Sequence, residues 1–447
     1  MTNLKRVPFS RKEAGKRGGT KHNESGDRST SVNNKNERSD GINLRVAVLF
    51  HRLGPYHFAR LRAAGRLLPI VAIESSGVDK TYAWDKVVGA DHFERVTLFD
   101  HSDAHKLPAA EVVSRIGSAL EKVHPVVVVV PGWADSAALG ALRWCVQKQV
   151  PAVAMSESTV WDKTRSVWRE AVKRQIVGLC STALVGGTPH KDYMIQLGMP
   201  AERVFLGYDA VDNRYFADKV AEVRSQKSEV GRKFGLPENY FLASARFVEK
   251  KNLPRLIEAY ARYRQLAAGS VVSGQVVPWS LVLLGDGALR SDLCRLISDL
   301  RLQDSVLLPG FKQYPDLPAY YGLANAFIHA SIVEPWGLVV NEAMASGLPV
   351  LVSNRCGCAM DLVKDGVNGF TFDPYNIEEM AQLMLKLSTL NPSQLSTMCA
   401  ASQHIIANWG PERFAQGLKA AAEKALRVGP AKASPMQRLI LRALLHK

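Results

Sequence analysis

The segment Phe327-Ile-His-Ala-Ser-Ile-Val-Glu334-Pro-Trp-Gly-Leu-Val-Val-Asn-Glu342-Ala-Met-Ala-Ser-Gly347-Leu-Pro-Val350 predicts a strand, a loop and a helix in direct succession. We expect the strand over Ala326–His329 and the helix over Gly337–Ser346, with Pro335 near its first turn, where proline is tolerated. A further strand over Pro349–Val352 follows directly. The segment is therefore a strand–helix–strand unit, and such units build parallel sheets.

The same alternation runs outward in both directions. In the second half we expect further strands at Tyr240–Ser244, Trp279–Leu284 and Val306–Leu308, and helices at Pro254–Gln265, Leu289–Leu300, Leu317–Leu323 and Ile377–Leu387. In the first half we expect strands at Leu44–Phe50, Pro69–Glu74, Val126–Val130, Val150–Met155 and Ala183–Val185, and helices at Phe58–Leu68, Pro108–Val123 and Ser136–Lys148. The fold class is therefore α/β, with two Rossmann-like doubly wound parallel-sheet domains that face a cleft.

Polar segments set the predicted domain boundaries. Residues 1–43 are basic and too poor in apolar side chains to fold, so we expect a disordered tail. A first Rossmann-like domain covers 44–212, and the alternation stops in a charged hinge or linker at 213–237. A second Rossmann-like domain covers 238–410, and a basic amphipathic tail covers 428–447.

The formal net charge of +15 is carried mainly by the chain ends. Residues 1–43 hold ten Lys or Arg against five Asp or Glu, and residues 424–447 hold six Lys or Arg and no acid, which leaves +4 for residues 44–423. A nucleic-acid-binding fold carries its basic patch on the fold itself, so we expect no specific nucleic acid partner. The scattered cysteines, the lack of an apolar signal sequence and the absence of any run of about 18 apolar residues favour a cytoplasmic protein.

Two acids of the first segment are candidates for ligand binding. Glu334 and Glu342 lie eight residues apart, or about 12 Å along a helix. Between them, the N–H groups at the helix start, near Gly337 and Leu338, form an anion site. This layout suits a ligand with hydroxyls at both ends and phosphate between, as in a nucleotide-sugar. The alternative is that Glu334 only caps the helix and that Glu342 is solvated.

Two cations follow the strand Tyr240–Ser244. Arg246 offers a planar fork of donors and Lys251 a compact charge, so together they suit a diphosphate leaving group. They follow a strand at the expected ligand edge, where stabilisation of a departing diphosphate would contribute most to catalysis. The alternative is that both are solvated loop residues.

Two glycine-containing turns also follow strands. Gly285-Asp-Gly287 and Pro309-Gly310-Phe311 allow the backbone to approach a ligand closely. Phe311 is a candidate to flank a base, the alternative being an ordinary core aromatic.

Taken together, these motifs resemble a known family. The Glu-x7-Glu element, the Arg246…Lys251 pair, Gly285-x-Gly287, Leu308-Pro-Gly-Phe311 and Gly347-Leu-Pro-Val350 make residues 240–426 similar to retaining nucleotide-sugar glycosyltransferases of family 4 (group 1), which have the GT-B architecture. The resemblance implies that Glu334 faces the donor sugar, Glu342 the nucleotide ribose, and Arg246 with Lys251 the diphosphate. It also implies a helix over 411–427 that crosses back to the first domain.

The first half carries weaker marks. Gly54-Pro55-Tyr56-His57 resembles the glycine loop that such enzymes hold near the diphosphate and the acceptor. Gly54 is therefore a donor-binding candidate. His57, Glu157 and Asp162 are acceptor-side candidates, the alternatives being a structural histidine and solvated acids. Many relatives carry a histidine after the fourth strand, where this chain reads Pro131-Gly-Trp-Ala-Asp135, so the resemblance does not identify the residue that assists the acceptor.

No metal or cofactor is expected. The other sugar-transfer architecture holds a divalent ion through an Asp-x-Asp element, and this chain has none. Cys356-Gly-Cys358 lacks a second ligand pair at zinc spacing. A clamp of cationic side chains makes a metal unnecessary.

The last residues predict a basic amphipathic helix at Pro435–Lys447, in which Arg438 and Arg442 accompany several leucines. Such a helix either docks on an anionic membrane surface, on the inner face of the membrane, or packs on its own protein. Docking would suit an acceptor carried on a lipid.

We therefore expect a glycosyltransferase that moves a hexose-type sugar from a nucleotide-diphosphate donor to a glycan or lipid-linked acceptor, without metal and, as the resemblance implies, with retention of configuration. One alternative is a nucleotide-sugar epimerase or sugar phosphorylase on the same fold. Another is a non-catalytic scaffold whose basic tails bind membrane or nucleic acid.

Overall fold

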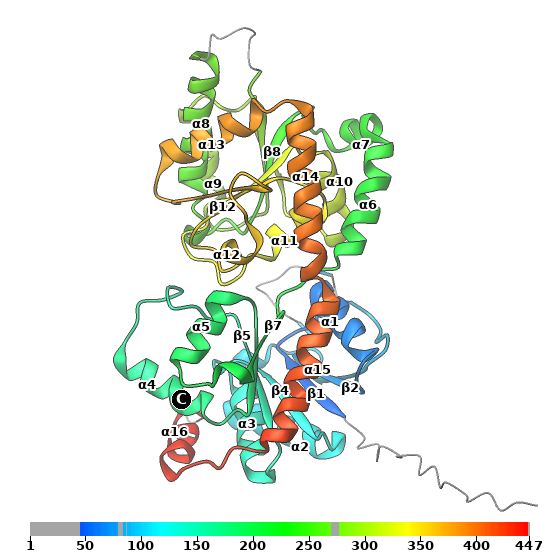
Figure 1. Cartoon of the computed structure of the whole chain (residues 1–447), viewed down its shortest axis with the longest axis vertical. Coiled ribbons are helices and arrows are strands. Elements are labelled where there is room, and N and C mark those ends of the chain that lie inside the picture. The colour runs from blue at the N-terminus through cyan, green and yellow to red at the C-terminus, as the bar shows by residue number, and fades with distance from the viewer. Residues whose placement is uncertain (1–44, 79–83, 86, 270–276, 446–447) are drawn as a thin grey trace, which may run out of the picture. The chain divides into compact units, whose positions relative to one another are not determined.

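The structure is a computed structural model that describes residues 45–78, 84–85, 87–269 and 277–445 (Figure 1). The tail expected at residues 1–43 lies outside the described residues. All described residues belong to one compact unit that starts at Asn43. Among the described helices, none is both long enough and apolar enough to cross a membrane.

The first half is built on a parallel sheet of seven strands in the order β3-β2-β1-β4-β5-β6-β7. The strands are β1 (Val46–Phe50), β2 (Ile70–Ser76), β3 (Glu94–Phe99), β4 (Val127–Pro131), β5 (Ala152–Ser156), β6 (Thr182–Val185) and β7 (Val204–Leu206). The four valines of β4 are completely buried, since both faces of this central strand are covered.

Alternate residues of these strands enter two separate cores. Ala47 and Leu49 pack with α2 (Ala109–Val123) and α3 (Ser136–Lys148) on one face of the sheet. Val46 and Val48 pack on the other face with α1 (Pro55–Gly65) and with α15 (Pro411–Val428) from the far end of the chain. Helices α4 (Val167–Val177) and α5 (Thr188–Gln196) complete this half.

The second half repeats the strand order on a parallel sheet of six strands, β10-β9-β8-β11-β12-β13. The strands are β8 (Tyr240–Ser244), β9 (Ser280–Leu284), β10 (Val306–Gly310), β11 (Ala326–His329), β12 (Val350–Ser353) and β13 (Gly369–Phe372). Its helices are α8 (Leu253–Gly269), α9 (Arg290–Asp299), α10 (Leu317–Leu323), α11 (Leu338–Ala345), α12 (Ala359–Leu362), α13 (Ile377–Ser388) and α14 (Pro392–Ile406).

The segment assigned to a hinge or linker is helical. It forms α6 (Asn213–Ser225) and α7 (Lys227–Phe234), and both helices contact α10 of the second half. The charged side chains that interrupt the strand–helix alternation lie on the outer faces of these helices, while Phe216 and Val220 are buried. The alternation of strands and helices is therefore interrupted here by two consecutive helices, and the role of this segment as a hinge or linker stays a prediction.

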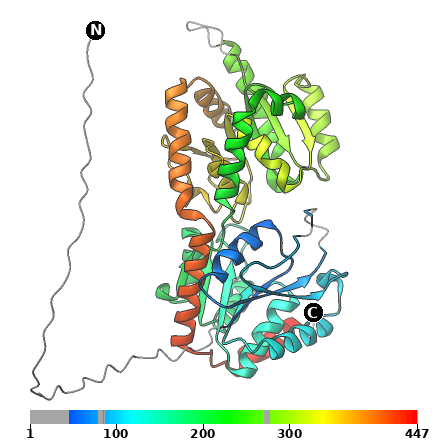
Figure 2. The same ribbon diagram turned by 90° about the vertical axis from the view of Figure 1, so that its right-hand side faces the viewer.

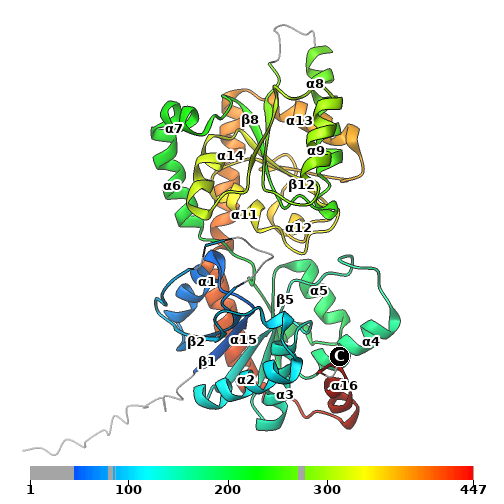
Figure 3. The same ribbon diagram turned by 180° about the vertical axis from the view of Figure 1, so that it is seen from behind.

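Two C-terminal helices return to the first sheet (Figures 2 and 3). Helix α15 contacts α1, β6 and β7, and buries Phe414 and Leu418 among the first-half side chains. Helix α16 (Pro435–Leu445) contacts α3 and α4, and its Leu441 is 3 % exposed. The expected crossover helix is therefore present, and the final helix packs Leu441 and Leu445 on its own protein.

Candidate active site

The loops after β8 and β11 meet at a cluster of polar side chains. Lys251, at the end of a short 3-10 turn, forms an ion pair with Glu334. The Glu334 carboxylate also lies 3.1 Å from His329 Nε2 and accepts a hydrogen bond of 3.3 Å from the Ser331 hydroxyl. The structure thus brings together Lys251 and Glu334, which sequence analysis had placed on separate motifs. His329 and Ser331 were part of the quoted segment, but were not selected as site residues.

Lys250 lies near the ion pair of Lys251 and Glu334, and Arg246 lies near Lys250. Burial lowers the pKa of Lys250; Glu334 opposes this effect, and the charges of Lys251 and Arg246 add to it. Burial raises the pKa of Glu334, but the charge of Lys251 and the hydrogen bond from His329 outweigh it and hold the pKa well below its ordinary value. Glu334 is therefore ionised among positive charges. Lys250, which sequence analysis did not select, belongs to the same cluster.

Two glycines after β9 hold the Arg246 loop close to the sheet. At Gly285, where φ is 128°, a Cβ atom would lie 1.8 Å from the carbonyl oxygen of Ala245. At Gly287, where φ is 153°, it would lie 2.7 Å from the carbonyl oxygen of Phe247. Glycine is required at both positions because any side chain would collide with the main chain that carries Arg246. Their contact with a donor stays a prediction.

Helix α11 begins after the loop that carries Glu334. Pro335 lies in that loop, near the first turn as predicted; Gly337 precedes the helix with a φ of 106°, and Leu338 is its first residue. Trp336 is fully buried, and its indole N–H donates to Asn341 Oδ1 at 2.8 Å. The anchored tryptophan and the left-handed glycine together fix the direction in which the Glu334 loop leaves β11.

Glu342 contacts a different set of groups. Glu342 is 1 % exposed. Its carboxylate accepts a hydrogen bond from the Tyr56 hydroxyl and another, of 2.6 Å, from the Tyr321 hydroxyl. Burial raises the pKa of Glu342 to about 7, although both tyrosine hydrogen bonds act in the opposite direction. The alternative of a solvated Glu342 is therefore wrong. Its contact with a ribose stays a prediction.

Phe311 is not a core residue. It is 40 % exposed, and its ring packs edge-on against Trp84 with 5.4 Å between centroids. Gly310 beside it has a φ of 85°, and nothing lies within 4 Å of the position of a Cβ atom. The aromatic face near Phe311 therefore remains a candidate for binding a base.

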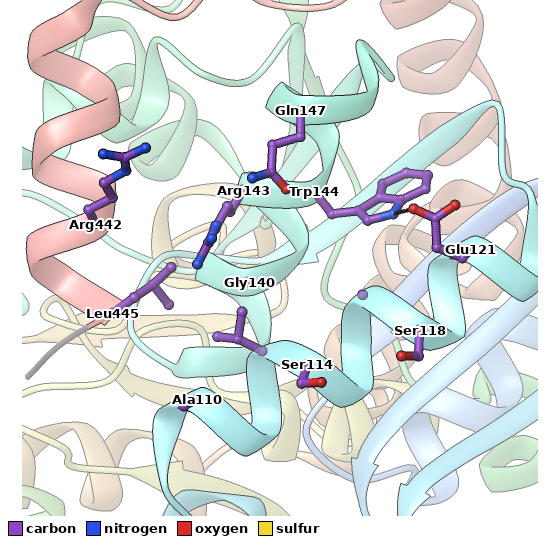
Figure 4. Close-up of a pocket in the computed structure, with 12 residues that line it drawn as sticks. Ala110, Ser114, Ser118, Glu121, Gly140, Arg143, Trp144, Gln147, Arg442 and Leu445 are labelled. Atoms are coloured by element: carbon purple, nitrogen blue, oxygen red, sulfur yellow. Dashed lines mark hydrogen bonds between the residues drawn. The ribbon is translucent and has the colours of Figure 1, made fainter.

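Two cavities of the described chain contain none of the predicted site residues. One, of about 420 Å³, lies between α2, α3 and α16, where Arg143, Trp144 and Arg442 surround small side chains (Figure 4). The other, of about 310 Å³, is lined by residues of α1 together with Trp84 and Tyr314. The candidate active site is thus defined by converging side chains and not by either of these cavities.

Gly54 and His57 form a cap at the start of α1. The Gly54 N–H donates to His57 Nδ1 at 3.2 Å. The same arrangement recurs at the start of α5, where the Gly187 N–H donates to His190 Nδ1 at 3.1 Å and His190 Nε2 donates to the Pro335 carbonyl at 2.8 Å. Burial lowers the pKa of both histidines, so the rings are neutral and carry their proton on Nε2. This geometry favours the structural alternative for His57.

The two acidic acceptor-side candidates differ in their surroundings. Asp162 is paired with Arg165 inside its own loop. Burial raises the pKa of Glu157, and Glu334 raises it further. The structure therefore brings Glu157, but not Asp162, into the surroundings of Glu334.

Among the described residues, one group has the composition of a metal site. The ligand atoms of His51, Asp103 and His105 lie within 4.8 Å of one another. The two imidazole rings, however, are stacked with 3.8 Å between centroids and 3° between planes. Imidazole nitrogen binds a metal in the plane of its ring, so two stacked rings cannot both direct a lone pair at one ion. The group does not fit a metal as it stands.

Comparison with known families covers the second half of the chain. Residues 226–402 match the model of the family described as "Glycosyl transferases group 1". This segment is therefore similar to the group 1 glycosyltransferases. The matched segment contains Arg246, Lys251, Glu334 and Glu342.

Two curated relatives share part of the chain. This chain is 33 % identical over 168 residues to a probable sucrose-phosphate synthase of Arabidopsis thaliana. The match covers 36 % of this chain and 16 % of that protein. It is 29 % identical over 191 residues to an alpha-D-kanosaminyltransferase of Streptomyces kanamyceticus, covering 42 % of this chain and 46 % of that protein. The chain thus spans about a sixth of the sucrose-phosphate synthase and under half of the kanosaminyltransferase.

Solved structures match nearly the whole described chain. A glycosyltransferase from Rickettsia africae is 14 % identical with a TM-score of 0.65, covering 86 % of this chain and 99 % of that one. The HepE protein of Anabaena, in complex with UDP-glucose, is 19 % identical with a TM-score of 0.61, covering 84 % of this chain and 98 % of that one. At these identities the likeness shows the fold. The expected pair of Rossmann-like domains in the GT-B architecture is confirmed.

Proposed function

We propose that the protein is a metal-independent glycosyltransferase that moves a hexose-type sugar from a nucleotide-diphosphate donor to a glycan or lipid-linked acceptor with retention of configuration. The observation that carries this proposal is the ion pair of Lys251 with Glu334, with Lys250 near both and Arg246 near Lys250, in the segment that matches the group 1 family. A departing diphosphate concentrates negative charge, and cations fixed in advance at that place stabilise the transition state more than the ground state.

The proposed roles follow from the charges. Arg246, Lys250 and Lys251 hold the diphosphate, and the ionised Glu334 orients the donor sugar and stabilises the positive charge that develops at its anomeric carbon. The bond from that carbon to the phosphate oxygen breaks while an acceptor hydroxyl forms the new bond on the same face. The hydroxyl proton passes to the departing phosphate oxygen, and attack on the face that the phosphate leaves preserves the configuration.

The named relatives support a nucleotide-sugar donor. One is an alpha-D-kanosaminyltransferase, and the Anabaena structure holds UDP-glucose. The ionised Glu334 within a cation cluster also favours transfer over the scaffold alternative, since a scaffold has no need of several buried charges at one loop edge.

For an acceptor carried on a lipid, we propose that α4 and α16 dock on an anionic membrane. Trp168 of α4 is 83 % exposed, and Met436 and Leu439 of α16 are 59 % and 62 % exposed. The two helices contact each other and carry Arg169 and Arg438, so apolar and basic side chains share one surface.

Co-sedimentation with vesicles of phosphatidylglycerol and phosphatidylcholine tests this docking. Trp168→Ser should bind the vesicles less than the wild type, and Val277→Ser is the matched control. Equal binding to purely neutral vesicles would contradict it.

Thermal unfolding with a panel of UDP-, GDP-, ADP- and dTDP-sugars tests the donor. One nucleotide class is expected to raise the unfolding midpoint of the wild type, because a ligand that binds only the folded state stabilises it. The exposed Arg295→Ala variant of α9 should respond as the wild type does, whereas Arg246→Ala should lose the response. The proposal is wrong if no nucleotide-sugar raises the unfolding midpoint of the wild type and the wild type releases nucleoside diphosphate from none of them.

A further inference from the structure

We propose that the cavity between α2, α3 and α16 binds the phosphodiester headgroup of an anionic lipid, with Arg143 and Arg442 as the side chains that hold the phosphate. This inference rests on the membrane docking proposed above for α4 and α16, and it adds the lipid chemistry that the protein recognises. The cavity has a volume of about 420 Å³, within the range of about 300–1,000 Å³ that is usual for small-molecule sites. It contains none of the residues proposed to hold the donor.

Two arginines from neighbouring helices line the cavity (Figure 4). Arg143 of α3 and Arg442 of α16 are both exposed, and within the described part of the chain neither guanidinium forms an ion pair or a hydrogen bond. The acid of the lining, Glu121, is already paired, because it accepts the Trp144 indole N–H at 2.9 Å and lies 2.7 Å from Lys148 Nζ. Two unbalanced positive charges around one cavity repel each other. A phosphate relieves this repulsion, and its oxygens match the planar donors of a guanidinium.

Two glycines of the lining differ in what they do for the fold. At Gly140 of α3, a Cβ atom would lie 3.0 Å from Ile116 Cγ2 and 3.2 Å from Val113 Cα, so this glycine allows α2 and α3 to pack closely. At Gly117 of α2, nothing lies within 4 Å of the position of a Cβ atom. Glycine inside a helix is less stable than alanine, and no contact within the protein requires it here. Gly117 instead leaves open the space between the two arginines and α2.

Neutral hydrogen-bonding groups complete the wall of the cavity. Ser114 and Ser118 lie one turn apart on α2, and Gln147 lies on α3 (Figure 4). None of these three side chains has a hydrogen-bond partner among the residues that the structure describes. Hydroxyl and carboxamide groups both donate and accept, so they suit the phosphate oxygens that the arginines leave free and the hydroxyls of a glycerol headgroup.

The apolar residues beside the cavity favour a lipid as the source of the phosphate. Met436, Leu439 and Arg442 are spaced three residues apart on α16 and therefore lie along one side of the helix. Met436 is 59 % exposed and Leu439 is 62 % exposed, while Leu445 contributes an apolar side chain to the cavity itself. A free phosphate gains nothing from exposed apolar neighbours. A lipid carries its acyl chains next to its phosphate, so it would contact both kinds of side chain.

The first test is co-sedimentation of the full chain with vesicles of phosphatidylglycerol and phosphatidylcholine. Arg143→Gln/Arg442→Gln should lower the partition coefficient at least about tenfold, since each basic residue at an anionic surface contributes about fivefold. The matched control Arg214→Gln/Arg295→Gln removes two exposed arginines of the second half and should stay within about twofold of the wild type.

The decisive variant is Gly117→Gln, which keeps both arginines and fills the cavity with a neutral side chain. It should lower the partition coefficient at least about fivefold, while its unfolding midpoint should not fall, because glutamine favours a helix more than glycine does. Gly231→Gln on α7 is the matched control and should bind as the wild type does. Wild-type binding by Gly117→Gln would show that the two arginines act only as part of a general surface charge, and it would overturn the inference.

The second test identifies the source of the phosphate through thermal unfolding. Dihexanoyl-phosphatidylglycerol, dissolved as monomers, should raise the unfolding midpoint of the wild type but not that of Arg143→Gln/Arg442→Gln, because it binds only the folded site. Inorganic phosphate and glycerol 1-phosphate at the same concentration should give a smaller shift. An equal shift with either of them would overturn the assignment to a lipid.

Failure of this inference can be told apart from failure of the proposed function. If the wild type binds no vesicles, the proposed membrane docking is wrong, and the response to the dissolved lipid still supports or overturns the headgroup site. If the wild type binds vesicles and Gly117→Gln binds them equally, docking stands and the headgroup site is refuted. The response to nucleotide-sugars should be the same in all of these variants, because the cavity shares no residue with the donor site.

Discussion

The hydroxyl of Tyr56 donates a hydrogen bond to the carboxylate of Glu342, although 286 positions separate the two residues in the chain. Tyr56 lies in α1, which packs on the first sheet, and Glu342 lies in α11, which packs on the second. The tyrosine therefore occupies an acceptor atom that the family resemblance assigns to a nucleotide ribose. A carboxylate oxygen can accept more than one hydrogen bond, so a ribose hydroxyl would either share this oxygen with Tyr56 or displace it.

The stability of the protein should depend on the ionisation of Glu342. Its pKa is about 7 in the folded protein against an ordinary value of 4.5, so the stabilisation is full below pH 4.5 and is lost as the pH rises through 7. Glu342→Gln should raise the free energy of unfolding at pH 8 by on the order of 3 kcal/mol and change little at pH 4. Urea unfolding at both pH values measures this, with the exposed Glu229→Gln as control. The prediction would be contradicted if the free energy of unfolding changed between pH 4 and pH 8 by the same amount in Glu342→Gln and in the wild type.

The ion pair of Lys251 and Glu334 should separate stability from donor binding. Both side chains are 12 % exposed, so Lys251→Met leaves a nearly buried carboxylate and should cost roughly 3 kcal/mol. The double variant Lys251→Met/Glu334→Gln should recover most of this loss in denaturant unfolding. Neither variant should be stabilised by the nucleotide-sugar that stabilises the wild type. A double variant that regains the donor response would remove Lys251 from the diphosphate site.

The two classes of glycine should respond differently to substitution. Gly285→Ala brings its methyl group onto the Ala245 carbonyl and should lower the unfolding midpoint strongly, because main-chain atoms cannot move aside. Gly310→Ala meets no atom within 4 Å and should cost only the strain of a positive φ, about 1 kcal/mol. Thermal unfolding of the two purified variants gives the comparison. Similar losses in both would show that the Arg246 loop is not held by close packing at Gly285.

Helix α16 should contribute to stability through its buried side and not through the side proposed to contact a membrane. Leu441 is 3 % exposed in the first-half core, and Leu439 is 62 % exposed on the same helix. Leu441→Ala should lower the free energy of unfolding by about 2–4 kcal/mol, whereas Leu439→Ala should leave it nearly unchanged. Chemical denaturation in the absence of lipid measures both effects. If both substitutions changed the free energy of unfolding by the same small amount, α16 would not contribute to the core.

The elements that the sequence predicts best are those with one strong signal. Strands β8 and β11 and helices α3 and α10 have the expected bounds, because apolar runs end at clear turn or cap residues. Strand β3 was not predicted because it carries polar residues on one face. In the structure these polar residues have a partner inside the sheet, because Arg95 and Thr97 both donate hydrogen bonds to the buried Glu74 of the neighbouring strand. Such a partner becomes visible only once strands are paired.

The candidate site shows the same division. Local motifs identified Arg246, Lys251 and Glu334, because each follows a strand at the edge where ligands bind. Lys250 was missed because two adjacent lysines look alike until the 3-10 turn sets their directions. The partners of Glu342 and Glu157 were missed for a different reason. They come from segments far apart in the chain, and their burial changes the pKa of the acid in a way that no local pattern records.

The return of α15 and α16 to the first sheet has a consequence for the order in which the protein can be made. The cores on the two faces of that sheet include Phe414 and Leu418 of α15 on one side and Leu441 of α16 on the other, so neither closes until these helices have been synthesised. The second sheet draws its core from a continuous stretch and can close earlier. During translation, the half that emerges first is therefore completed last, and it must wait with apolar surface uncovered while the other half folds.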